Sequence, residues 1–151
     1  MPARSEIEEK IRDFAIQEGI LGKPLPHDAK LEFGYEINYP PNSPQPVKIV
    51  ALKPIDRKAV SFQIATQIAP PHVEALKKLG DNGIIRFFEM LKKFLLLQNL
   101  LYNIDVKNAR YIISDIIYPD GLTEQQFLTN IRKVFNASLY LNITLNEMIL
   151  G

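Results

Sequence analysis

The 151-residue sequence contains no cysteine, and this absence excludes several kinds of site at once. Without cysteine there is no disulfide, no thiolate nucleophile and no cysteine-ligated zinc or iron–sulfur centre. The absence also fits a protein of the reducing cytosol. Residues 1 to 5 have no apolar core of the kind that a secretory signal peptide carries. We therefore expect a cytoplasmic protein.

An excess of one charge and long apolar runs are lacking as well. Lysine and arginine number 18 against 17 aspartates and glutamates, which gives a formal net charge of +1. Domains that bind nucleic acid usually have a strong basic excess, because neutralising phosphates supplies most of their affinity. The longest apolar runs, such as Phe94 to Leu97, are four residues, whereas a membrane span needs about 20. We expect neither a nucleic-acid partner nor a membrane partner.

The residue patterns of common catalytic and binding sites are missing too. His27 and His72 lie in separate loop-like segments without a partner at metal-ligand spacing. No serine occupies a G-x-S-x-G turn; Ser61 and Ser114 fall within predicted strands. The glycines of 80–83 lack the lysine and the preceding strand of a phosphate-binding loop. The sequence therefore predicts no catalytic residue, no metal and no cofactor.

Asp115 is the residue that best fits a role in acid–base chemistry. It interrupts the apolar run 112–117, and a half-buried carboxylate has a raised pKa unless it is paired. One interpretation is a catalytic group. The favoured interpretation is a structural ion pair, with Arg110 or Arg86 as its partner.

Periodic patterns predict one domain over 1–151, with an N-terminal tail over 1–4. Alternation over 30–39 and 60–68 predicts two strands, and 47–53 is expected to form a third strand between them. The four prolines of 40–46 predict an exposed rigid connection. The other expected elements are a helix over 5–19, a linker over 23–26, a helical segment from 70 that breaks at 80–83 and resumes over 84–101, strands over 102–106 and 110–118, and a helix from 123 onward. Capping boxes at Ser5–Glu8 and Thr123–Gln126 mark two of the helix starts. The expected fold is an α+β two-layer sandwich with an antiparallel sheet, in the order α-βββ-α-ββ-α.

The segment 84–101 is more apolar than a helix that covers one sheet requires. A covering helix needs one apolar stripe, yet the four residues Phe94 to Leu97 point in all directions. The outer side is covered either by the chain's own helices or by a second chain. Because two-fold dimers are the commonest oligomers, we expect a homodimer.

Several segments resemble one known family. The residues Ile-Tyr-Pro-Asp-Gly-Leu-Thr of 117–123, followed by Phe127 and by Lys-Val-Phe-Asn-Ala of 133–137, resemble the archaeal domain of unknown function 2299 family. The segment 69–76 and the helix residues Phe88 and Leu91 are also similar to it. The likeness covers about 30–150 and implies a YbjN and type III secretion chaperone-like fold, whose members are often dimers. It implies no catalytic residues. The two-residue link 107–108 and the proline-rich loop depart from the family pattern.

Two functional hypotheses follow. The leading one is a non-enzymatic, dimeric protein-interaction or chaperone-like domain that holds a protein client on a sheet edge or groove. The alternative is a small-molecule-binding protein or small enzyme with a pocket between the sheet and the helix over 84–101. In that alternative, Asp115 or Tyr111 would supply polar contacts.

Overall fold

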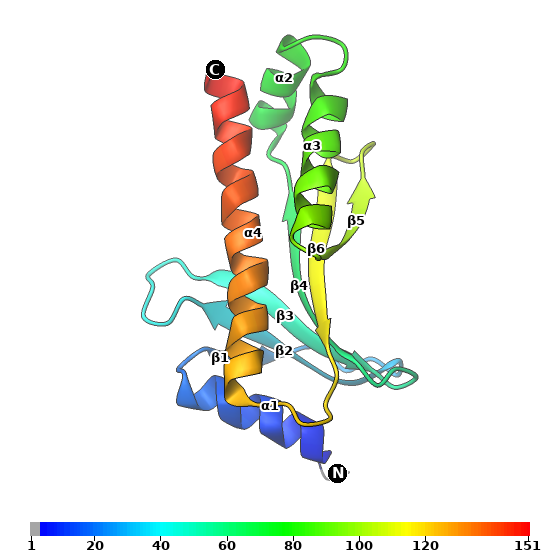
Figure 1. Ribbon diagram of the computed structural model, residues 1–151, viewed down its shortest axis with the longest axis vertical. Coiled ribbons are helices and arrows are strands. Elements are labelled where there is room, and N and C mark those ends of the chain that lie inside the picture. The colour runs from blue at the N-terminus through cyan, green and yellow to red at the C-terminus, as the bar shows by residue number, and fades with distance from the viewer. Residues whose placement is uncertain (1–3) are drawn as a thin grey trace. The chain divides into compact units, whose positions relative to one another are not determined.

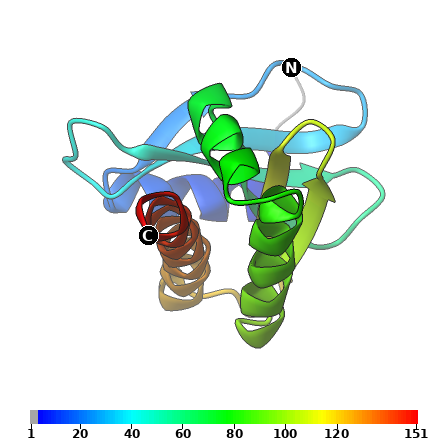
Figure 2. The same cartoon turned by 90° about the horizontal axis from the view of Figure 1, so that it is seen from above.

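The computed structural model describes residues 4–151 and shows an α+β protein (Figures 1 and 2). Its helices are α1 (Glu6–Gln17), α2 (Pro70–Lys78), α3 (Gly83–Leu97) and α4 (Glu124–Leu150). Its strands are β1 (Leu21–Pro24), β2 (Leu31–Tyr39), β3 (Val47–Pro54), β4 (Val60–Gln67), β5 (Leu101–Asp105) and β6 (Arg110–Ile117). The sheet has the order β1-β2-β3-β4-β6-β5. The predicted α+β class and antiparallel sheet are confirmed, while the predicted tail lies outside the described residues except for Arg4.

The observed order differs from the predicted one at two places. Residues 23–26, expected as a linker, contribute Lys23 and Pro24 to the additional strand β1. β1 is an edge strand, where the missing N–H of proline breaks no pairing between strands. The helix expected to continue to Leu101 ends at Leu97, and Leu101 already belongs to β5.

The described residues form two compact units, which are considered separately. The first comprises 4–63 and 115–135, and the second comprises 64–114 and 136–151. The single domain expected from the sequence stays a prediction.

The first unit has an aromatic core. The ring of Phe127 in α4 packs on Phe14 of α1, with ring centroids 5.7 Å apart, and on Phe62 of β4 at 5.6 Å. β2 contributes the alternating buried residues Phe33, Tyr35 and Ile37 that its sequence predicts. These contacts fix α1 and the first part of α4 against the strands.

The Ser5 hydroxyl accepts a hydrogen bond from the Glu8 amide at 3.2 Å and begins α1 as predicted. The other half of this predicted capping box is not formed by Glu8. The Glu8 carboxylate instead accepts a hydrogen bond from the Tyr35 hydroxyl. The second capping box is complete: the Gln126 amide donates to the Thr123 hydroxyl, and the Thr123 amide donates to the Gln126 side chain, both at 3.1 Å.

The second unit is built on α3. Phe87 and Phe88 pack against Tyr111 of β6, with ring centroids 6.4 and 6.3 Å apart. Gly83 begins the helix because a side chain there would meet the Leu76 carbonyl oxygen of α2 at 1.9 Å. Gly83 thus allows the start of α3 to pack closely against α2. The break between the two helices falls at 79–82, where the sequence predicts one.

Candidate functional site

The last turn of α3 carries exposed leucines. Leu91 and Leu95 are fully buried, whereas Leu96 is 66% exposed and Leu97 is 83% exposed. Residues 4–151 therefore cover only part of the apolar excess predicted for this helix. Exposed apolar residues that lie together mark interaction surfaces more often than isolated ones do.

The chain reverses directly after these leucines. Asn99 has a φ of 57°, the left-handed conformation that commonly ends a helix. The Asn99 amide donates to the Leu96 carbonyl at 3.1 Å, and the Leu100 amide donates to the Leu95 carbonyl at 3.0 Å. This Schellman motif buries Leu100 and starts β5 at once.

β5, the strand that follows, exposes two further apolar side chains. Leu101 is 52% exposed and Tyr102 is 37% exposed. We call Leu96, Leu97, Leu101 and Tyr102 the α3–β5 surface. Four large apolar side chains within seven residues of chain are thus accessible to solvent.

α4 exposes further apolar side chains in the same unit. The Phe94 ring of α3 stacks on Tyr140, with centroids 4.0 Å apart and an interplanar angle of 7°. Leu139 and Ile143, one position before and three positions after Tyr140, are about half exposed, as Tyr140 is. The stacked pair places Tyr140 next to α3.

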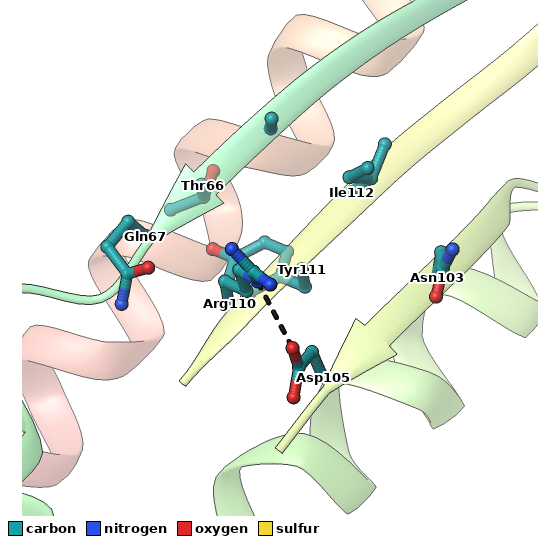
Figure 3. A pocket seen from close by; sticks show the side chains of 8 residues that line it. Thr66, Gln67, Asn103, Asp105, Arg110, Tyr111 and Ile112 are labelled. Carbon is teal, nitrogen blue, oxygen red and sulfur yellow. Dashed lines mark hydrogen bonds and ion pairs between the residues drawn. The ribbon is translucent and has the colours of Figure 1, made fainter. Parts of the chain in front are cut away.

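A hollow of about 520 Å³ lies on strands β4, β5 and β6 (Figure 3). All eight lining residues come from these strands and none from α3. Arg110 Nε donates to Asp105 Oδ2 at 3.1 Å, so the charges across the two strands neutralise each other. The hollow thus combines a closed ion pair with neutral polar side chains.

The pKa values of two groups of the hollow, Asp105 and Tyr111, are shifted away from neutral pH. Hydrogen bonds from the Asn108 side chain and backbone, followed by Arg110, lower the pKa of Asp105. Burial raises the pKa of Tyr111, against a smaller lowering by its hydrogen bond with Thr66. Because a general acid or base works best with a pKa near the working pH, neither group is suited to that role.

Asp115 belongs to the first unit and forms a structural ion pair. Its Oδ2 lies 3.5 Å from Lys133 Nζ and accepts a hydrogen bond from Asn130 Nδ2 at 3.0 Å. The ion-pair interpretation is confirmed, but both predicted partners are wrong. Arg110 pairs with Asp105, and Arg86 donates to the Leu79 carbonyl. Lys133 was missed because it is 18 residues away on α4, and no local pattern links the two positions.

The histidines lie apart from other ligands. His72 is an exposed residue in the first turn of α2, as predicted, and His27 is exposed in the segment after β1. Over 4–151, no three side chains of histidine, aspartate or glutamate come together as metal ligands. None of the helices in the same range has the length and apolarity to span a membrane.

Two carboxylates of the first unit interact unfavourably. Desolvation, followed by the hydrogen bond and charge of Glu18, raises the pKa of Glu124. A raised carboxyl pKa means that the native state binds the proton more tightly than the unfolded state does. This contribution to stability is present at low pH and is lost as the pH rises through the native pKa.

We expect Glu18→Gln to raise the melting temperature at pH 7, because it removes the like charge beside Glu124. The gain shrinks as the pH falls through the raised pKa of Glu124 toward the ordinary glutamate value of 4.5, because Glu124 then loses its charge in the wild type. Thermal unfolding from pH 3 to 8 measures the difference. A gain that stays constant across this range would show that the two carboxylates are not coupled.

The comparisons with known proteins agree with this fold. The family described as uncharacterized conserved protein (DUF2299) matches residues 7–145. The chain therefore belongs to this family. A crystal structure of an uncharacterized protein from Methanothermobacter thermautotrophicus is similar, with a TM-score of 0.84 and 23% identity over 95% of this chain and 99% of that one. No protein with a curated description matches.

Proposed function

We propose that the chain is a non-enzymatic protein-interaction domain that works as a homodimer through the α3–β5 surface. The observation that carries this proposal is the exposure of Leu96 and Leu97 beside the buried face of α3. Full burial of one leucine side chain is worth roughly 1.5–3 kcal/mol. A second copy would cover the same residues on both subunits, as a two-fold interface requires.

The proposal includes a chaperone-like role in the cytoplasm. Leu139, Tyr140 and Ile143 of α4 offer a further exposed apolar surface for a protein client. The absence of cysteine supports a reducing compartment. The chaperone element also draws on the resemblance that the sequence suggests, and fold alone does not determine function.

Binding of a small polar ligand in the hollow on β4, β5 and β6 is the alternative. Its neutral polar groups, such as Asn103 and Gln67, could contact a ligand. However, Asp105 and Arg110 already satisfy each other. A ligand would therefore have to replace an existing ion pair or leave it intact, which makes this alternative weaker than the dimer.

Light scattering of Leu97→Asp tests the proposed dimer. We expect the wild-type protein to have twice the chain mass of 17.3 kDa and Leu97→Asp to be a folded monomer. Loss of leucine burial in both subunits, together with burial of a charge, should raise the dissociation constant at least about 100-fold.

Asn146→Asp is the matched control, because it adds the same charge at an exposed position of α4 and should leave the dimer intact. Circular dichroism establishes that each variant is folded. A wild-type protein that stays monomeric at high micromolar concentration would refute the homodimer.

A further inference from the structure

β5 is the outermost strand of the second unit. In the sheet order of residues 4–151 it neighbours only β6, so within this part of the chain no strand lies beside its other edge. Figure 1 shows no other element of this unit beyond that edge. The N–H and C=O groups of an open edge can pair with a strand from another chain.

The edge of β5 lacks three features that usually prevent such pairing, namely lysine, proline and a bulge. It is five residues long, and its one charged residue, Asp105, is paired with Arg110 of β6. β5 has neither lysine nor proline, and its register with β6 runs without a shift from Leu101–Ser114 to Asp105–Arg110. Its first two residues belong to the exposed α3–β5 surface.

β1, the edge strand of the first unit, is protected. β1 has only four residues, among them Lys23 and Pro24. Its pairing with β2 shifts register between Leu21 and Pro24. The chain therefore presents one protected edge, β1, and one unprotected edge, β5.

We propose that β5 pairs antiparallel with β5 of a second copy across a two-fold axis. This inference rests on the proposed homodimer and assigns the strands that form its interface. We assign a second copy of this chain as the partner. Each copy has one open edge, β5, so pairing two copies uses both open edges. The edges that remain are the protected β1 strands. The assembly then closes as a dimer, as isologous interfaces do.

The strand sequence suits this pairing with Asn103, its central residue, next to the axis. Asn103 then lies opposite the partner's Asn103, and Tyr102 lies opposite the partner's Ile104. Aromatic and β-branched residues in opposite positions stabilise a sheet. Asp105 lies opposite the partner's Leu101, so the two aspartates do not face each other.

Two variants that introduce opposite charges at Asn103 test the two-fold pairing. Asn103 is exposed, so the monomer should tolerate both Asn103→Lys and Asn103→Asp. Each variant alone places like charges opposite each other, which should raise the dissociation constant at least about tenfold. An equimolar mixture should form a heterodimer with an affinity near that of the wild type, seen as a mixed mass by native mass spectrometry.

The outcomes separate this inference from the proposed function. If the wild type is a dimer and both Asn103 variants dimerise equally well, the pairing of β5 is wrong and the homodimer stands. If both variants are monomers and the mixture forms no heterodimer, the two-fold register is wrong. A monomeric wild type overturns both proposals.

Hydrogen exchange of the wild type gives a test that needs no variant. Amides of 101–105 should become more protected as the protein concentration rises through the dissociation constant, while those of β1 should not. Equal protection of 101–105 at all concentrations, in a protein that light scattering shows to dimerise, would overturn the pairing.

The pair Asn146→Lys and Asn146→Asp is the control for the Asn103 variants. It adds the same charges at an exposed position of α4, outside β5.

Discussion

Replacing Phe127 with alanine should lower the free energy of unfolding by about 3–5 kcal/mol, the usual cost of removing a buried phenylalanine ring. The side chain is fully buried and packs on Phe14 and Phe62, which come from α1 and β4. Its removal leaves a cavity where three elements of the first unit meet. Since domains of this size have a total stability of roughly 5–15 kcal/mol, the variant should be only marginally stable.

Urea unfolding followed by circular dichroism measures the effect. Phe127→Leu keeps most of the volume and should cost much less, under about 1.5 kcal/mol. Gln125→Ala, at an exposed position of the same helix, should change stability by less than about 0.5 kcal/mol. Equal losses for Phe127→Ala and Gln125→Ala would contradict the aromatic core described here.

The buried lysine of the first unit should make the stability depend strongly on its partner. Lys53 is only 9% exposed, and its Nζ lies 3.2 Å from Glu32 Oε1. The other Glu32 oxygen accepts from the Ser5 hydroxyl at 3.0 Å. Removing one member of such a pair leaves an uncompensated charge. We expect Glu32→Ala to cost about 1–3 kcal/mol, below the value for a fully buried pair, because the Glu32 side chain is 33% exposed.

A double-mutant comparison separates the loss of the pair from the loss of packing. The variant with both Glu32→Ala and Lys53→Met should unfold within about 1 kcal/mol of the wild type, because apolar replacement of a buried ion pair is often neutral or stabilising. Denaturant unfolding of the single and double variants provides the four free energies. A double variant less stable than Glu32→Ala would show that Lys53 contributes something other than its charge pair with Glu32.

Local patterns predicted most of the fold, because they record interactions between neighbouring residues. The alternation over 30–39 became β2, and the Thr123–Gln126 capping box began α4 as its residues indicate. Each of these signals depends on residues within a few positions of each other. Such interactions can be recognised from the sequence without the tertiary structure.

Features that depend on distant partners could not be predicted in this way. Pro24 favoured a linker, and only its place on an edge made a strand possible. Glu8 was expected to close its own capping box, yet Tyr35, 27 residues away, takes its carboxylate. The apolar excess of α3 was visible in the sequence. Which of its leucines stay exposed depends on Asn99, whose left-handed conformation ends the helix.

The protected edge of β1 has a consequence that polymer chemistry describes well. A monomer with one reactive end can only form pairs, whereas a monomer with two reactive ends forms chains. Because Lys23, Pro24 and the register shift protect β1, the proposed pairing gives each molecule a single reactive edge, β5. These few residues of β1 would thus decide between a closed pair and a growing fibre.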